Sequence, residues 1–212
     1  MKKTLTNKVA IKIADALNKH SPKEGIAYKK IVYGTEVILI NVSKIIIIMA
    51  VAAAFGVVPQ TLFALIGFNA LRQTAFGVHA LTNIGCVLSS IVMFVLTPFM
   101  LRGFAATPLM IAVVFSLILV AMCLYAPADT KARPLVNAKR RKKFKKISIV
   151  ICLIMTVALM ISPFREVNFI VMLGASYSAI FVLPITYKLL KRESNNYERY
   201  AEYLNRSNEL RA

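Results

Sequence analysis

The sequence predicts an all-α integral membrane protein: a bundle of about six transmembrane or partly spanning helices, with an N-terminal amphipathic interfacial helix. Hydrophobic residues make up 58% of the 212 positions, against roughly 45–50% in soluble domains. Apolar stretches of about 20 residues, long enough to cross a bilayer, recur along the chain. The 27 Lys and Arg residues gather between these stretches and give a formal net charge of +18, as expected of cytoplasmic loops.

This distribution of charge makes anionic lipids the expected partner and argues against nucleic-acid binding, since no recognition motif accompanies the basic clusters. The three cysteines, Cys86, Cys123 and Cys152, all lie in apolar segments without a CxxC spacing. We therefore expect neither a disulfide framework nor a metal site, and no cofactor. The first thirty residues lack the apolar core of a cleavable signal peptide.

Residues 1–36 are expected to form helices at the cytoplasmic side of the membrane. Within residues 2–20, apolar side chains recur at helical spacing and lysines occupy other faces, which predicts an amphipathic helix in the membrane interface. Ser21 and Pro22 predict the start of a second short helix. The alternative for this region is a solvated arm. The apolar positions are Leu5, Val9, Ile13, Ala16 and Leu17.

The membrane-embedded domain is expected over residues 37–187. Its first span, 37–58, is interrupted by Asn41, Ser43 and Lys44, which are costly in lipid unless they face protein or water. The next apolar stretch runs from about Gln60 and meets Arg72 after barely a dozen residues, too short for an ordinary span. It predicts a broken or re-entrant element, or a span whose last turns face a polar cavity.

Four further spans are predicted by the apolar stretches 81–101, 109–126, 147–164 and 167–187. Between the second and third of these, residues 127–146 hold nine Lys or Arg residues against the single acid Asp129. This segment is predicted to be a cytoplasmic loop. Counting the crossings from it places both termini, including the polar tail 188–212, in the cytoplasm.

Chemically capable residues concentrate near the cytoplasmic face, where Arg72, His79 and Cys86 follow one another at intervals of seven. An imidazole that takes the proton of a thiol makes it a nucleophile, so this pair suffices for acyl transfer. In a continuous helix seven residues rise about 10.5 Å, and both side chains would point toward the N-terminus. We therefore predict that His79 lies at or before the start of the helix carrying Cys86. The alternative is that both residues are structural.

Several separate motifs then match one family in order. They are the run from Arg72 to Ala80 with Cys86 seven residues after His79, the sequence Tyr33-Gly34-Thr35-Glu36, and Pro127-Ala128-Asp129-Thr130-Lys131 followed by Pro134. Together they resemble the accessory gene regulator B (AgrB) family, over roughly residues 5–190.

The resemblance implies a membrane cysteine endopeptidase of Gram-positive bacteria that acts in quorum sensing. Such enzymes remove the C-terminal tail of an AgrD-like propeptide and close the product into a thiolactone or lactone ring. By position, Cys86 resembles the nucleophile, His79 its base, and Arg72 and Glu36 supporting residues. The family also implies a homodimer. One departure is Phe76, because the family often has two adjacent glycines before the histidine.

Three roles stay open. The oxyanion stabiliser could be Gln73, Arg72 or a backbone N–H near Cys86. The basic cluster serves either topology and lipid contact or docking of an acidic propeptide tail. Lys44 either snorkels or pairs with Glu36. The cluster comprises Lys139, Arg140, Arg141, Lys142 and Lys143.

A rival function is a non-enzymatic exporter or channel for a peptide or a small cation. Membrane residence and the polar groups of the first span favour it. The two functions differ in one requirement, because an exporter does not need the thiol of Cys86.

Overall fold

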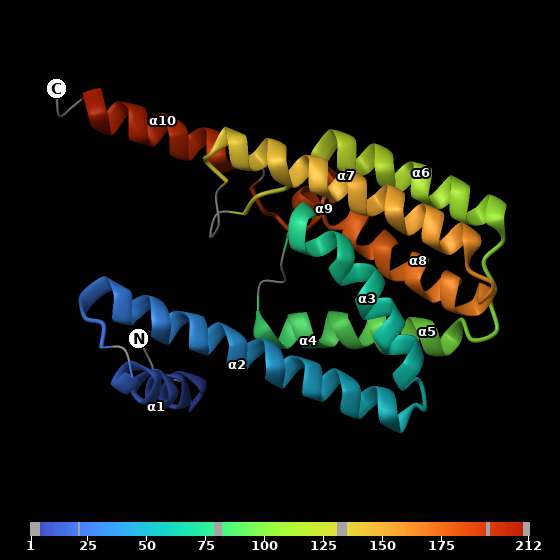
Figure 1. Ribbon diagram of the computed structural model, residues 1–212, viewed down its shortest axis with the longest axis horizontal. Coiled ribbons are helices and arrows are strands. Elements are labelled where there is room, and N and C mark those ends of the chain that lie inside the picture. Colours follow the sequence, from blue (N-terminus) through green and yellow to red (C-terminus); the bar gives the residue numbers. More distant parts are fainter. Residues whose placement is uncertain (1–4, 21, 79–81, 131–134, 194–195, 210–212) are drawn as a thin grey trace.

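The computed structural model describes residues 5–20, 22–78, 82–130, 135–193 and 196–209. Over these ranges the chain is helical and holds no β-strand, which confirms the all-α prediction. Figure 1 shows two layers: α6, α7 and α8 lie together in one, α2 and α4 lie in the other, and α3 passes between them.

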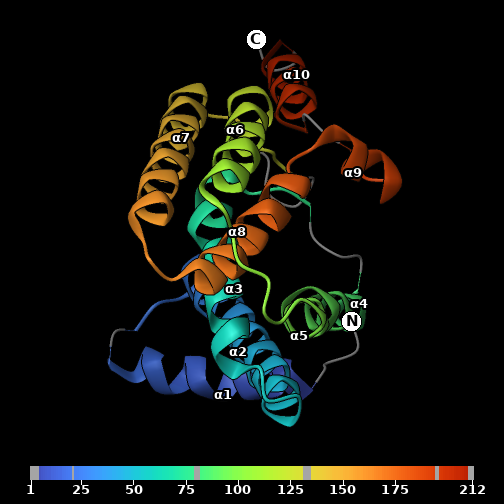
Figure 2. The same cartoon turned by 90° about the vertical axis from the view of Figure 1, so that its right-hand side faces the viewer.

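The N-terminal helix α1 (Leu5–His20) packs against the first half of α2 (Gly25–Ala54). Ala10 and Ala14 of α1 are fully buried there, whereas Val9, Ile13 and Leu17 are exposed. The exposed stripe and its neighbouring lysines confirm the predicted amphipathic character. Figure 2 shows α1 lying across α2 at the edge of the molecule.

The predicted second short helix is wrong. Residues 22–24 are not helical, and α2 runs from Gly25 without interruption into the first span, where it ends at Ala54 and not near residue 58. No proline follows Pro22 before residue 59, so no helix breaker separates the cytoplasmic turns from the apolar ones.

The short stretch that meets Arg72 forms one unbroken helix, α3 (Val58–Ala75), with Pro59 in its first turn. It is therefore not broken. Arg72 lies in its last turn, where its side chain can reach the end of the helix instead of entering the apolar part.

Helix α3 packs closely against α8 (Arg165–Ile180) in the centre of the bundle. Glycines allow this approach: a β-carbon at Gly67 would collide with the backbone of Val171, and one at Gly174 with the backbone of Ala64. Small residues at a membrane helix interface let the two backbones come together without a hydrophobic driving force.

A single rod formed by α4 (Asn83–Ile91), the π-helical segment η1 (Val92–Leu96) and α5 (Thr97–Met100) confirms the predicted span 81–101. The π-segment ends before Pro98, which has no backbone N–H to continue the regular ladder. Thr97 Oγ1 donates to the carbonyl of Val92 at 2.8 Å and stabilises the wider turn.

Helix α6 (Pro108–Tyr125) matches the predicted span 109–126 within one residue. Helix α7 (Ala138–Ile161) begins well before its predicted start at residue 147. Residues 138–146 of the expected basic loop are therefore the first turns of a helix. Asn137 caps this helix, because its side chain accepts from the N–H of Arg140 at 3.2 Å. Lys and Arg favour helices, so a charged run does not by itself indicate a loop.

The predicted last span, 167–187, is also too long. Helix α8 ends at Ile180, a turn follows, and α9 (Pro184–Leu189) starts a new direction. Proline disfavours helical geometry at the residue before it, and Leu183 is extended. The tail forms α10 (Asn196–Glu209).

Within the described ranges, four helical segments are long and apolar enough to cross a membrane: α2, the α4–α5 rod, α6 and α7. Helices α3 and α8 lie in the centre of the bundle. The ends of α3, α6 and α8 meet the beginnings of α4 and α7 at one side of the bundle, which we call the basic end because it carries the cations of α7.

Candidate active site

Cys86 lies in the first turn of α4 at the basic end. Thr82 caps this helix: its Oγ1 accepts from the N–H of Gly85 at 3.0 Å, and its carbonyl accepts from the N–H of Cys86 at 3.0 Å. The Cys86 side chain is half-buried. Cys123 is half-buried within α6 and Cys152 is buried within α7, so only Cys86 of the three lies at the start of a helix.

His79 lies outside the described residues. Helix α4 begins at Asn83, behind an extended Thr82, so position 79 precedes the helix that carries Cys86, as the seven-residue spacing predicts. The segments on either side of residues 79–81 are described, and they show how the chain arrives at this position.

Arg72 organises the segment that leads to His79. Its guanidinium donates hydrogen bonds to three successive carbonyls, those of Phe76, Gly77 and Val78, the Gly77 bond being 3.2 Å long. The planar group also lies 5.3 Å from the ring centre of Phe181. A fork of donors in fixed geometry suits such multiple binding.

Three N–H donors of Arg72 are bound to these carbonyls, which suits the side chain to positioning the segment of residues 76–78. The N–H groups of Gly85 and Cys86 are likewise occupied, by Thr82.

The turn after α3 has an unusual backbone. Phe76 has φ 56° and ψ −128°, and Gly77 has φ 106°. Glycine adopts such angles without strain, whereas a residue with a β-carbon does not. Phe76 therefore stands in a conformation that favours glycine. Its ring packs edge-on against Phe144 of α7 at 5.1 Å.

The same turn pairs with the segment after α6. The N–H of Gly77 donates to the carbonyl of Ala128 at 2.9 Å, and the N–H of Ala128 donates to the carbonyl of Ala75 at 2.9 Å. On the other side, the N–H of Val78 donates to the carbonyl of Phe181 at 3.1 Å. The approach to His79 is thus held between the segment after α6 and the end of α8.

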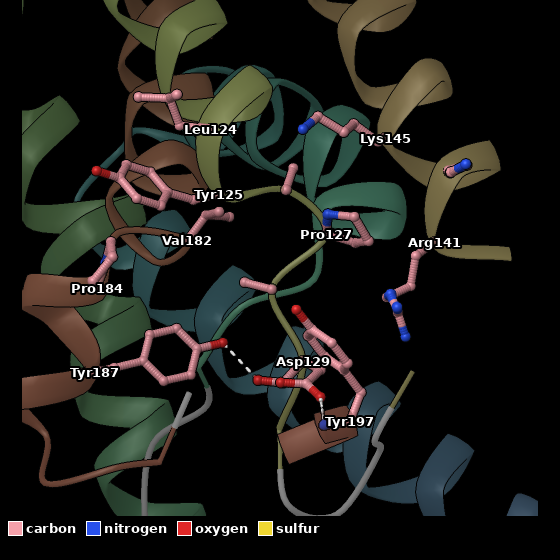
Figure 3. A pocket seen from close by; sticks show the side chains of 13 residues that line it. Leu124, Tyr125, Pro127, Asp129, Arg141, Lys145, Val182, Pro184, Tyr187 and Tyr197 are labelled. Carbon is pink, nitrogen blue, oxygen red and sulfur yellow. Dashed lines mark hydrogen bonds between the residues drawn. The ribbon is translucent and has the colours of Figure 1, made fainter. Parts of the chain in front are cut away.

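Beside this pairing lies a cavity of about 520 Å³. Figure 3 shows its side chains converging from α6, α7, α9 and α10 on the segment around Pro127. Its lining includes Ala128, which pairs with the turn that precedes His79. The lining residues are Leu124, Tyr125, Ala126, Pro127, Ala128, Asp129, Arg141, Lys142, Lys145, Val182, Pro184, Tyr187 and Tyr197.

Asp129 is buried at the wall of this cavity and caps α10. Its carboxylate accepts from the N–H of Asn196 at 3.1 Å and from the N–H of Tyr197 at 2.7 Å. An anion is stabilised there because the free N–H groups of a helix start carry partial positive charge. The carbonyl of Asp129 also accepts from the hydroxyl of Tyr187 at 2.8 Å.

Tyr187 keeps its proton in this environment. Burial, reinforced by the negative charge of Asp129 and opposed by the cation of Arg72, raises the pKa of Tyr187 to about 12. Its hydroxyl therefore remains a donor at neutral pH. The contact links α9 to the segment that carries Asp129.

The predicted basic cluster divides into two groups. Arg141 and Lys142 line the cavity, together with Lys145, whereas Lys139, Arg140 and Lys143 lie outside its wall. The guanidinium of Arg141 stacks 3.9 Å from the ring centre of Tyr197 and donates to the carbonyl of Leu135 at 2.8 Å.

Two predicted supporting residues stand apart from this arrangement. Glu36 of α2 accepts a hydrogen bond from Asn7 of α1 at 3.0 Å and forms no ion pair with Lys44 among the described residues. Gln73 is exposed on α3. The structure does not bring either of them into contact with Cys86.

Sequence reasoning missed three residues that shape the cavity: Asp129, Tyr187 and Tyr197. A signal existed for Asp129, because it is the single acid in a strongly basic segment, and an isolated acid there indicates a specific partner. The described residues contain no group of three or more His, Cys, Asp or Glu side chains that could hold a metal ion.

Comparison with known proteins agrees with the motifs. The family model for accessory gene regulator B matches residues 6–186. An AgrB-like protein of Listeria innocua is 39% identical over 173 residues, which cover 82% of this chain and 85% of the relative. One of Clostridium acetobutylicum is 34% identical over 206 residues, covering 97% and 99%.

The accessory gene regulator protein B of Staphylococcus carnosus is 33% identical over 184 residues, which cover 85% of this chain and 96% of the relative. No solved structure is significantly similar to the chain.

Proposed function

Because the chain belongs to the accessory gene regulator B family, which acts in quorum sensing together with an AgrD propeptide, we propose that it is a membrane cysteine endopeptidase. It would remove the C-terminal tail of that propeptide and cyclise the remainder. The observation that carries the proposal is the position of Cys86, half-buried in the first turn of α4 and directly after the segment that Arg72 organises.

The first step is cleavage of the propeptide. His79 takes the proton of the Cys86 thiol, and the sulfur attacks the carbonyl carbon of the scissile bond. His79 then returns the proton to the leaving nitrogen, the C–N bond breaks, and the tail departs with a free amine. The remainder of the peptide is held as a thioester on Cys86.

The second step closes the ring. A cysteine thiol within the bound peptide attacks the thioester carbon, and the Cys86 sulfur leaves and recovers a proton. One thioester replaces another when the attacking group is a thiol, whereas a hydroxyl gives a lactone. Exclusion of water from the membrane-embedded site protects the intermediate from hydrolysis.

Arg72 acts as a positioning residue in this mechanism. Its three hydrogen bonds to the carbonyls of residues 76–78 define the path of the chain toward His79. Cleavage should therefore depend on Arg72 even though the side chain does not touch the peptide.

The cavity at the basic end is suited to receive an acidic propeptide tail. Arg141, Lys142 and Lys145 supply positive charge to its wall, and it adjoins the turn before His79. We place this end in the cytoplasm of the bacterial cell, with both termini on the same side and anionic lipids around it.

Reversing the charge of Arg141 and Lys142 to Glu should weaken binding of the tail. Reversal of Lys139 and Lys143, which are exposed and outside the cavity, is the control for altered lipid contact. Equal cleavage by both double variants, once insertion is verified, would eliminate the cavity as the docking site.

The endopeptidase itself is tested with purified protein in liposomes and the cognate propeptide. Release of the tail is compared between wild type and the variants Cys86→Ala, His79→Ala and Cys123→Ala. We expect loss of release in the first two, normal release in the third, and a covalent peptide adduct on Cys86 in the wild type. Full activity of Cys86→Ala would remove the nucleophile and favour the exporter.

A further inference from the structure

Helix α2 presents two polar residues that the proposed mechanism does not use, Asn41 and Lys44. The side of α2 that faces the bundle is defined by Ile48 and Ala52, which are 5% and 0% exposed. Positions four and seven residues before Ile48 lie on that same side of a helix. The side chains of Lys44 and Asn41 therefore lie on the side of α2 that faces the bundle.

These residues lie at the level of the first turns of α4. Helix α2 contacts α4 and η1, and the helices run in the same direction (Figure 1). Residues 48–52 of α2 share an apolar cluster with residues 91–95 of the rod. Four residues before Ile48 and Ile91 lie Lys44 and residue 87, which is the neighbour of Cys86 in the sequence. Three residues before these lie Asn41 and Ile84.

The bundle does not cover this part of α2. Asn41 is exposed and Lys44 is half-buried, while Ile84 on the facing helix is 74% exposed. Neither polar side chain has a hydrogen bond or ion pair within the described part of the chain. An amide and a cation inside a membrane helix are costly unless protein, water or ligand supplies partners.

We propose that the propeptide segment next to the scissile bond lies between α2 and α4, held by Asn41 and Lys44. Cys86 is five residues before Ile91, which packs toward α2, so its thiol points about 140° away from that side of α4. The peptide therefore passes around the first turn of α4 to bring the scissile bond to Cys86. This rests on the proposed endopeptidase function. The ammonium group of Lys44 donates to a carbonyl or carboxylate of the peptide, and the amide of Asn41 both donates and accepts, as an extended backbone requires. Both are positioning residues on the wall opposite the helix of Cys86.

The position of the peptide is tested by a photoreactive amino acid placed singly at residues 41, 44 and 46 of the full-length protein in liposomes. Ile46 is the control, because it is 62% exposed and its side chain lies on the opposite side of α2 from Ile48. We expect cross-links to the propeptide from 41 and 44, and to lipid from 46. Cross-links to lipid alone at 41 and 44 would overturn the proposal.

The chemistry of Lys44 is tested by the kinetics of tail release. Lys44→Met keeps the length of the side chain and removes its charge, and we expect KM to rise roughly 10- to 100-fold, the effect of one charge-assisted hydrogen bond. Lys44→Arg should recover most of the affinity. Lys29→Met, at an exposed position of the same helix, is the control. An unchanged KM in Lys44→Met would refute the contact.

Tail release by Cys86→Ala and the cross-links at residues 41 and 44 distinguish failure of the endopeptidase from failure of the peptide position. If Cys86→Ala is inactive but residues 41 and 44 give no peptide cross-link, the endopeptidase stands and the peptide lies elsewhere. If Cys86→Ala retains full release, the endopeptidase itself is wrong, whatever the cross-links show.

Discussion

Arg72 donates a hydrogen bond of 3.2 Å to the carbonyl of Gly77, and a β-carbon at Gly77 would collide with that same guanidinium group and with the carbonyl of Phe181. The turn before His79 is therefore packed so tightly that a single methyl group cannot be added. Its geometry also depends on the positive φ of Gly77, 106°.

We expect Gly77→Ala to abolish tail release, because Arg72 and Phe181 must move apart. Gly103→Ala separates this effect from backbone strain, since Gly103 also has a positive φ, 82°, but nothing lies within 4 Å of an added β-carbon. Backbone strain should lower the free energy of unfolding of each variant by about 1–3 kcal/mol, and thermal unfolding in detergent measures this loss. Only Gly77→Ala should lose activity. Equal activity in both would contradict this.

Arg72→Lys should reduce tail release by roughly 10- to 100-fold, because a lysine cannot bind three carbonyls in one plane. Arg102→Lys is the comparison: Arg102 also donates to two carbonyls, those of Phe55 and Gly56, and lies over an aromatic ring, but at the opposite end of the bundle. If the two variants lose activity equally, the role of Arg72 is general stability.

Phe76→Gly should be more stable than Phe76→Ala by about 1–2 kcal/mol, since only glycine relaxes at φ 56° and ψ −128°. Both variants lose the ring contact with Phe144 equally. Phe63 is the control position, because it lies inside α3 and is partly exposed. There Phe63→Ala should be more stable than Phe63→Gly. Thermal unfolding of the four variants tests this, and the same order at both positions would exclude strain at Phe76.

Asp129→Ala should release the start of α10, whose N–H groups lose both carboxylate bonds. A cap of this kind contributes about 1–2 kcal/mol, so local opening should rise roughly 5- to 30-fold. Tryptic cleavage at Arg199, which is exposed in α10, reports the opening. Asp15→Ala, in α1, is the control and should leave the rate of tryptic cleavage unchanged. If Asp129→Ala also leaves this rate unchanged, the Asp129 carboxylate does not stabilise the start of α10.

Tyr187 gives a pH dependence with a definite sign. Its pKa is about 12 in the folded protein and 10.0 when unperturbed, so its contribution to stability is complete below about pH 10 and is lost as the pH rises toward about 12. Tyr187→Phe cannot ionise. The stability advantage of the wild type over this variant should therefore shrink across that window, and a constant difference in unfolding temperature would contradict it.

Apolar periodicity predicted a helix well where a capping residue or a proline marks each of its ends. Helix α6 follows Thr107, begins at Pro108 and ends before Pro127, and its prediction is within one residue. The end of α8 was wrong because the chain stays apolar through the turn at residues 181–183. That turn forms where the carbonyl of Phe181 accepts from Val78, a partner that no local pattern shows.

The same limit applies to the site. The types and spacing of Arg72, His79 and Cys86 predicted thiol chemistry and the position of the helix start, and these inferences need only the chain and helical geometry. Neither the binding of Arg72 to three backbone carbonyls nor the pairing of Gly77 with Ala128 could be predicted, because backbone groups are identical at every residue.

The sequence by itself determined the membrane class, the family and the amphipathic first helix, and it predicted the residues proposed for acyl transfer, because these depend on side-chain chemistry and on periods of a few residues. Only the tertiary structure decided that Asp129 caps a helix 67 residues later and that Ile48 of α2 packs with Ile91 and Val95 of the rod. Such contacts join distant segments, and their existence depends on how helices pack, which is set by the fit of whole surfaces and not by any one stretch of chain.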